Sequence, residues 1–149
     1  MAIVAVGEHE DYVLVDTTVF IYLARGQERA QRFLPYVEGR RVVLSFVSVA
    51  ELWRGAYAQQ YGVARRRRLE SDIAGTVVVQ PTEDLAHEWA RLSNEARGMS
   101  PGHALGQKAQ AHDAWIAATA RLYKLPLLTE DSDFAGMPGL SLLLDDPVR

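Results

Sequence analysis

Residues 12–23 read YVLVDTTVFIYL, and this stretch decides the fold class. Its first four residues are apolar or aromatic and include two β-branched valines, which predicts a buried strand. Directly after Asp16, apolar side chains at positions 19, 20 and 23 follow the spacing of a helix. The stretch therefore predicts a strand that runs directly into a helix, which is the repeating unit of α/β folds.

Short apolar runs alternate with segments of helical periodicity along the rest of the chain. Further strands are predicted at 42–45, 76–79, 127–129 and 140–144, helices at 28–37, 48–61, 82–98 and 108–123, a further helix after Gly62, and a loop at 99–106. This order predicts an α/β fold around a mostly parallel sheet of about five strands. We expect a single domain across residues 1–149.

The composition excludes several classes of protein. With 149 residues, 48% of them hydrophobic and 23% charged, the chain is long and apolar enough for a core and is unlike a disordered segment. It contains no cysteine, which excludes disulfides, a thiolate nucleophile and thiolate-bound metals. The start of the chain lacks the features of a signal peptide, and no apolar run approaches the roughly 18 residues of a membrane span. We therefore expect a soluble, cytoplasmic protein with no membrane association.

The charges are distributed unevenly, although the net charge is only −3. Residues 25–68 carry ten arginines against three acids. Four of these arginines are consecutive and fall in the predicted helix after Gly62: Arg65, Arg66, Arg67 and Arg68. Such a run can follow a nucleic-acid backbone or contact an acidic partner, or it can be an ordinary solvated helix face. The sequence leaves these interpretations open.

Acidic residues lie where the chemistry of an α/β fold is expected, at the carboxyl ends of the strands. Asp16 follows the first predicted strand, and Glu51 lies near the start of the helix after the second. Asp131 and Asp133 follow the strand at 127–129. Asp113 lies within the helix at 108–123, on the face that carries small and apolar side chains. A carboxylate on a buried face is costly unless it is paired or bound to a metal.

Carboxylates crowded at one edge repel one another unless a cation neutralises them. Mg²⁺ and Mn²⁺ prefer oxygen ligands and commonly connect carboxylates to substrate phosphates. A site of this kind activates water for attack on a phosphodiester. The pattern therefore predicts a divalent metal site with hydrolytic activity.

Most of these acids also have a purely structural interpretation. Asp16 can cap the helix that follows it, and Ser48 with Glu51 fits the S-x-x-E capping box. Asp131 or Asp133 can be a turn or cap residue. Asp113 is harder to explain in this way, because it is predicted to lie in the middle of a helix. One metal site accounts for the whole set more simply than several independent caps.

Four blocks of the sequence resemble the PIN-domain ribonucleases, in particular the VapC toxins of bacterial and archaeal toxin–antitoxin pairs. They are VLVDTTVFIY at 13–22, SFVSVAEL at 45–52, HDAWIAATA at 112–120 and LLTEDSDF at 127–134. In order and spacing, the resemblance extends over residues 12–144. It implies an α/β/α sandwich and an endoribonuclease that depends on Mg²⁺ or Mn²⁺ and inhibits translation.

The resemblance also implies roles for individual residues. Asp16, Glu51 and Asp113 match the first three metal-binding acids of the family. Asp131 and Asp133 both fall at the fourth, with Asp131 favoured as the ligand and Asp133 in support. Two threonines match supporting positions: Thr18, where the family often has Ser or Asn, and Thr129, which matches a frequent active-site threonine.

The partners implied by the resemblance are an RNA substrate, a VapB-type antitoxin that occupies the acidic cleft, and a second copy of the chain in a homodimer. The helical pair that contains residues 65–68 contributes to dimer and antitoxin contacts in similar proteins. Residues 1–11 are an N-terminal extension about which the resemblance says nothing.

Two other functions are compatible with parts of the acidic pattern. A phosphatase of the haloacid dehalogenase type uses the aspartate after the first strand as its nucleophile. It also requires a second aspartate two residues later, where this chain has Thr18. A non-catalytic module, whose acids hold a structural cation or an arginine-rich partner, stays open because its ligands would look the same.

Overall fold

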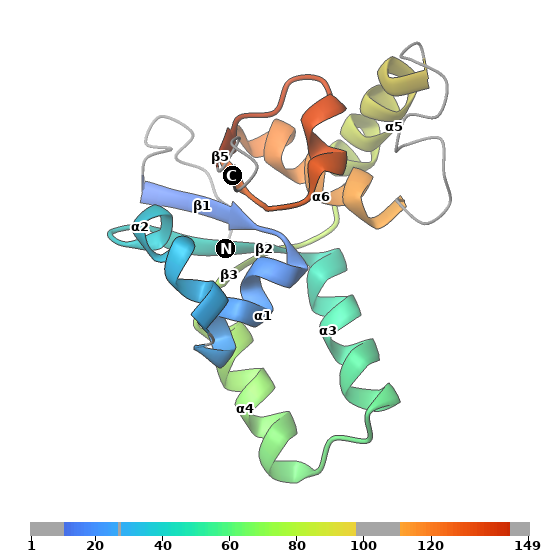
Figure 1. Cartoon of the computed structure of the whole chain (residues 1–149). Coiled ribbons are helices and arrows are strands. Elements are labelled where there is room, and N and C mark those ends of the chain that lie inside the picture. Colours follow the sequence, from blue (N-terminus) through green and yellow to red (C-terminus); the bar gives the residue numbers. More distant parts are fainter. Residues whose placement is uncertain (1–10, 27, 98–110, 144–149) are drawn as a thin grey trace.

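Strand β1 (Tyr12–Val15) lies at the centre of a five-stranded sheet with the order β3-β2-β1-β4-β5 (Figure 1). The computed structural model describes residues 11–26, 28–97 and 111–143. The other strands are β2 (Arg41–Ser45), β3 (Val77–Val79), β4 (Leu127–Leu128) and β5 (Leu142–Leu143), and all four pairings are parallel. The predicted α/β fold with a parallel sheet is thereby confirmed. The predicted loop at 99–106 and the extension 1–11, apart from Asp11, lie outside the described residues.

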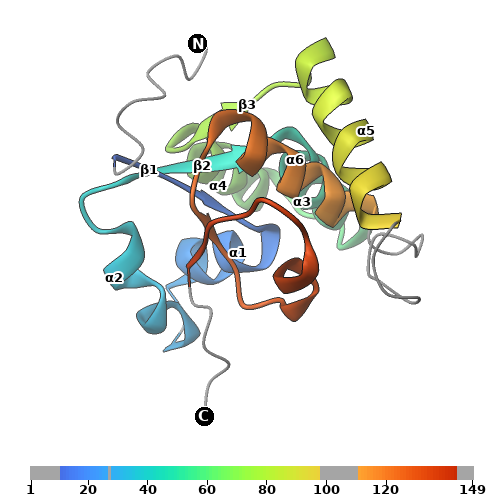
Figure 2. The same cartoon turned by 90° about the horizontal axis from the view of Figure 1, so that it is seen from above.

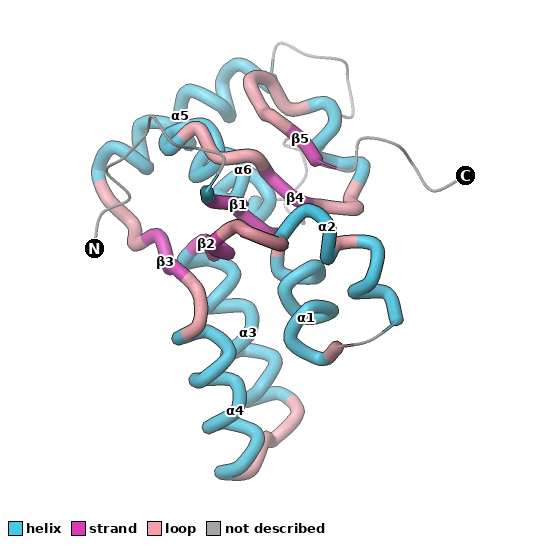
Figure 3. Tube along the Cα trace, turned by 90° about the vertical axis from the view of Figure 1, so that its left-hand side faces the viewer, coloured by secondary structure: helices cyan, strands magenta, loops and turns pink. Residues whose placement is uncertain are grey.

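Helices cover both faces of the sheet and form the outer layers of a sandwich (Figures 1 and 2). One face carries α1 (Thr17–Arg25), α2 (Leu34–Val37), α3 (Phe46–Ala58) and α4 (Val63–Ala74), and the other carries α5 (Glu83–Arg97) and α6 (Ala111–Tyr123). Helices α3 and α4 form a hairpin that extends away from the sheet (Figures 1 and 3). None of the described helices has the length and apolar character needed to cross a membrane.

The central strand has apolar side chains on both of its faces. Val13 and Val15 belong to the core beneath α1 and α3, whereas Leu14 belongs to the core beneath α5 and α6. All three side chains are fully buried. A parallel strand with a helical layer on each side requires such a continuous apolar run, which explains why residues 12–15 form the middle of the sheet.

The helix predicted at 28–37 is wrong as a continuous element. The structure has a 3-10 helix, η2 (Glu28–Arg32), followed by the four-residue α2. Pro35 causes the break, since its ring has no N–H to donate and clashes with the carbonyl group four residues earlier. The Phe33 amide donates instead to the carbonyl of Ala30 at 3.0 Å, the three-residue step of a 3-10 turn.

The alternative interpretation of Ser48 and Glu51 as a capping box is wrong. Helix α3 begins two residues earlier than predicted, with Ser45 as its N-cap, and the Ser45 hydroxyl accepts a hydrogen bond from the Val47 amide at 3.2 Å. Ser48 is fully buried inside the helix and accepts a hydrogen bond from the Thr17 hydroxyl at 2.8 Å. Glu51 is therefore free of any capping role at this helix.

A charged network joins α5, α6 and the segment after the 3-10 helix η5 (Ser132–Gly136). The Arg121 guanidinium lies 2.8 Å from the buried Glu88 carboxylate and 2.7 Å from that of Glu95. It also donates to the carbonyl of Pro138 at 3.4 Å. Arg91 reaches the second Glu88 oxygen at 2.8 Å. Arg121 thus holds three separate segments together from a largely buried position.

Candidate metal centre

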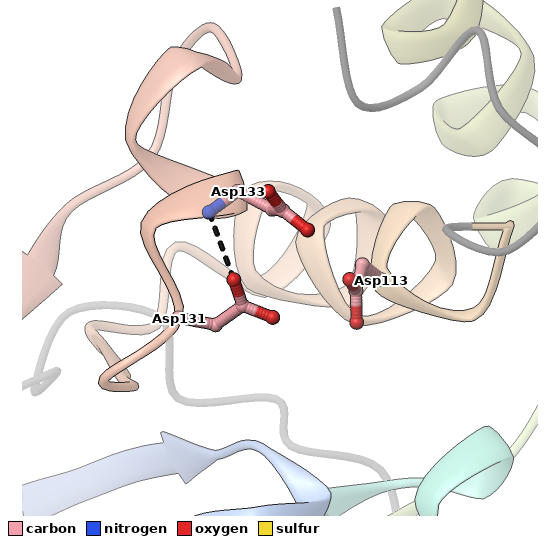
Figure 4. A group of neighbouring side chains, drawn as sticks. All are labelled: Asp113, Asp131 and Asp133. Atoms are coloured by element: carbon pink, nitrogen blue, oxygen red, sulfur yellow. Dashed lines mark hydrogen bonds between the residues drawn. The ribbon is translucent and has the colours of Figure 1, made fainter.

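Three aspartates converge at the carboxyl edge of the sheet, as Figure 4 shows. Asp113 lies in the first turn of α6, Asp131 caps η5, and Asp133 lies in the first turn of η5. Each offers a carboxylate oxygen, and these three atoms lie within 4.8 Å of one another. The Asp133 amide donates to the Asp131 carboxylate at 2.9 Å, so the turn itself orients Asp131. Asp113, Asp131 and Asp133 are called the aspartate cluster below.

Asp16 is connected to the aspartate cluster through the hydroxyl of Thr129. This buried hydroxyl donates to one carboxylate oxygen of Asp16 and accepts from the backbone amide of Asp131 at 3.0 Å. The other Asp16 oxygen accepts from the Val19 amide at 2.8 Å, so Asp16 also caps α1. The capping interpretation and the placement of Asp16 beside the cluster are thus compatible. One threonine side chain thus contacts both the acid that follows β1 and the turn that follows β4.

Glu51 lies outside the aspartate cluster, on α3, and is paired with His112. One Glu51 carboxylate oxygen is 3.4 Å from Nδ1 of His112. Burial raises the pKa of Glu51, although His112, Arg54 and the neighbouring Thr17 hydroxyl act in the opposite direction. Neither His112 nor Thr17 was predicted as a site residue. The sequence contained the same indication for both, because Thr17 directly follows Asp16 and His112 directly precedes Asp113.

The acids disturb one another's ionisation. Burial, together with the negative charges of Asp131, Asp133, Asp16 and Glu51, raises the pKa of Asp113 to about 7. Burial also raises the pKa of Asp16 to about 6, against the hydrogen bonds from Thr129 and Val19, which lower it. These values show that the five predicted acids share one electrostatic environment, although only three of them form the aspartate cluster.

The donor atoms suit a hard divalent cation. All three ligands that the aspartate cluster offers are carboxylate oxygens, the type that Mg²⁺ and Mn²⁺ prefer. A cation here would also offset the repulsion that raises the pKa of Asp113. The residues present therefore fit a divalent metal, with Asp113, Asp131 and Asp133 as the ligands closest to one another.

The remaining predicted residues lie away from the aspartate cluster. Thr18 is exposed and lines a groove of about 710 Å³ between α1, α3 and α4. The arginines at 65–68 are in α4, where Arg65 stacks over the Tyr61 ring at 3.7 Å and Arg66 over the Tyr57 ring at 5.0 Å. Arg65 and Arg68 line the same groove as Thr18.

The affinity for a divalent cation is expected to rise with pH, because Asp113 must lose its proton before it can act as a ligand. With a pKa of about 7 for Asp113, we expect affinity at pH 6 to be about 10-fold weaker than at pH 8, and the ionisation of the nearby Asp16, whose pKa is about 6, acts in the same direction. Above about pH 7.5 the affinity should level off. Isothermal titration with Mn²⁺ between pH 5.5 and 8 measures this directly. An affinity that does not change over this range would contradict the assignment of Asp113 as a metal ligand.

The comparisons with known proteins agree with this geometry. The PIN domain family model matches residues 13–140, and the chain therefore belongs to the PIN domain family. Among its relatives is Ribonuclease VapC5 of Mycobacterium tuberculosis, which is 31% identical over 128 residues, covering 85% of this chain and 87% of that protein. Ribonuclease VapC4 of the same organism is 30% identical over 132 residues, covering 87% of this chain and 94% of that one.

Solved structures show the same fold. The VapBC-5 complex from Mycobacterium tuberculosis matches with a TM-score of 0.60 and 28% identity, covering 89% of this chain and 96% of the matched chain. FitAcB from Neisseria gonorrhoeae matches with a TM-score of 0.64 and 28% identity, covering 91% and 97%. VapBC2 from Rickettsia felis, with a TM-score of 0.69, 17% identity and coverage of 89% and 97%, shares the fold. The predicted resemblance to PIN-domain proteins of the VapC type is confirmed.

Proposed function

We propose that this chain is the toxin of a VapBC-type toxin–antitoxin pair, an endoribonuclease that cleaves RNA in the cytoplasm and so inhibits translation. The observation that carries the proposal is the aspartate cluster, three carboxylate oxygens within 4.8 Å, in a PIN-domain chain that is 31% identical to Ribonuclease VapC5. We assign Mg²⁺ or Mn²⁺ as its cation, because both prefer oxygen ligands and connect carboxylates to phosphates.

Each site residue has a distinct role in this proposal. Asp113, Asp131 and Asp133 hold the cation, and Asp16 and Glu51 complete its negative surroundings. Thr129 is a positioning residue, since its hydroxyl joins Asp16 to the backbone of Asp131. We assign Thr18, which lines the groove between α1, α3 and α4, a supporting role.

The chemistry that a divalent cation supplies at such a site is the activation of water and the neutralisation of charge on the phosphate. The chain itself contributes the orientation of the cation and the substrate. With a cation bound, Asp113 is an ionised ligand, because the positive charge offsets the repulsion that contributes to raising the pKa of this carboxyl to about 7 in the metal-free protein. The chain offers no cysteine that could act as a covalent nucleophile.

The partners of the proposed toxin follow from the charges of its surface. An acidic edge suits a cationic side chain such as an arginine of a VapB-type antitoxin, which would compete with the metal. The arginines at 65–68 are proposed to contact RNA or the antitoxin, and Arg65 and Arg66 are already oriented by tyrosine rings. We also propose a homodimer.

Cleavage of total cellular RNA by the purified protein tests this function. We expect discrete fragments with Mg²⁺ or Mn²⁺, and none after EDTA or with the Asp113→Asn variant. Sequencing the fragment ends would identify the target RNA. Intact RNA with both cations would contradict the proposal and favour a non-catalytic module whose acids bind a cation or a partner.

A further inference from the structure

A second hollow, of about 340 Å³, lies beside the acidic edge, between the first turns of α3 and of α6. Its volume is at the lower end of the roughly 300–1,000 Å³ that is typical of small-ligand sites. Besides Glu51, the lining residues are Phe46, Val47, Ala50, Arg54, His112 and Trp115. The lining thus combines two large aromatic side chains with two side chains that can carry positive charge.

Phe46 occupies an unusual position for a phenylalanine. It directly follows Ser45, the last residue of β2, and its side chain is 44% exposed. The Ser45 cap and the parallel pairing of β2 fix the backbone on both sides of it. A large apolar ring is therefore held at the surface by rigid elements, at the sheet edge where the acids lie.

The second aromatic residue of the lining is also held in place. Trp115 of α6 stacks on Trp89 of α5, with ring centroids 5.0 Å apart and an angle of 15° between the planes. This stack fixes the ring of Trp115, so the hollow has two aromatic lining residues on rigid elements. Flat aromatic walls bind nucleobases by stacking, and every base has a face that can stack.

The hollow and the acidic site share a boundary. Glu51 lines the hollow and pairs with His112, which directly precedes the cluster residue Asp113. A phosphodiester held at the aspartate cluster would therefore have its neighbouring nucleotide near this hollow. The exposed Arg54 supplies a cation on the same side, which suits the phosphate of that nucleotide.

We propose that this hollow holds one unpaired base of the RNA substrate, next to the cleaved bond, stacked against Phe46 with Arg54 contacting its phosphate. The inference rests on the proposed ribonuclease function and adds to it a subsite for one base. The positive charge of Arg54 favours the contact with the phosphate, against the repulsion of the neighbouring acids. Phe46 would supply the ring on which the base stacks.

Binding of a fluorescent hexauridylate, followed by anisotropy with Mg²⁺ present, tests this subsite separately from cleavage. All variants are made in the Asp113→Asn background, which keeps the RNA intact. We expect Phe46→Ala to weaken binding about 10-fold, and Phe46→Tyr, which keeps the ring, to change it less than about 2-fold. Leu34→Ala is the matched control, since Leu34 on α2 is 42% exposed, and it should leave binding unchanged.

A second probe separates stacking from contacts with the backbone. An abasic hexamer of the same length should bind more weakly than the hexauridylate, and Phe46→Ala should weaken it no further. Equal losses for both RNAs, or no loss for either, would overturn the proposal. Sedimentation velocity measures the oligomeric state of the same proteins. If Phe46→Ala converts a dimer to a monomer, this surface is an interface between copies of the chain and the proposal is wrong.

Discussion

Asp113→Asn is expected to abolish RNA cleavage, by at least about 100-fold, and at the same time to stabilise the metal-free protein at neutral pH. The loss of activity follows from removing one of three carboxylates that lie within 4.8 Å of one another. The gain in stability follows from the raised pKa of Asp113, which reflects burial and the repulsion of four neighbouring acids.

The pH dependence of the free energy of unfolding shows why Asp113→Asn is expected to stabilise the metal-free protein. The Asp113 carboxyl ionises near pH 3.8 when it is unperturbed but at a pKa of about 7 in the folded protein. The folded state therefore binds this proton more tightly than the unfolded state, and the free energy of unfolding falls as pH rises from about 4 to about 7. Asparagine carries no such proton, so the variant should lose less stability over this range.

Urea denaturation at pH 4, 6 and 8, with EDTA present, measures this difference. The two proteins should be similar at pH 4 and should diverge as pH rises, with the variant more stable at pH 8. Asp84→Asn is the control, because it removes the same charge from an exposed position in the first turn of α5. If Asp113→Asn unfolds the protein while cleavage persists, Asp113 has a structural role and the metal assignment fails.

Arg121→Met is expected to lower the free energy of unfolding by about 2 kcal/mol. Breaking a buried ion pair from one side typically costs about 3–5 kcal/mol, because the remaining charge is left without its partner. The loss is smaller here, since Arg91 still contacts the Glu88 carboxylate at 2.8 Å. Methionine preserves most of the length of the side chain, so the change isolates the guanidinium.

Arg91→Met provides the matched comparison for this second prediction. The Arg91 side chain is 58% exposed, against 15% for Arg121, although each contacts the same carboxylate. An exposed pair contributes at most about 1 kcal/mol, so the Arg91 variant should remain close to the wild-type stability. Equal losses of stability in urea denaturation would mean that the burial of Arg121 and its contacts with two other segments contribute nothing.

Local sequence patterns predicted those parts of the fold that depend on local properties. The apolar run before Asp16 predicted the central strand, because a strand buried on both faces needs apolar side chains throughout. Pro35 was an equally local signal, and including it would have divided the helix at 28–37 correctly. The start of α3 was misjudged because Ser45 and Ser48 are both possible caps, and only tertiary contacts decide between them. The buried hydrogen bond between Thr17 and Ser48 is one such contact.

The site was less accessible to prediction than the fold. The positions of the acids after the predicted strands indicated that they lie at one edge of the sheet. These positions could not indicate that the Thr129 hydroxyl connects Asp16 with the backbone of Asp131. The pairing of Glu51 with His112 depends on how α3 and α6 approach each other, and helix packing of this kind has no signature in a short segment. The exposure of Phe46 is likewise a property of the assembled surface.

The acids at the edge of the sheet follow strands that differ in length and in hydrogen bonding. Asp16 follows β1, which is hydrogen-bonded on both sides, to β2 and to β4. Asp131 and Asp133 follow β4, which has only two residues and whose outer neighbour β5 is equally short. Short strands near a sheet edge open locally at less cost than the centre does. Local fraying would therefore separate the carboxylates while most amide protons stay protected from exchange, so activity would fail on warming before the fold does.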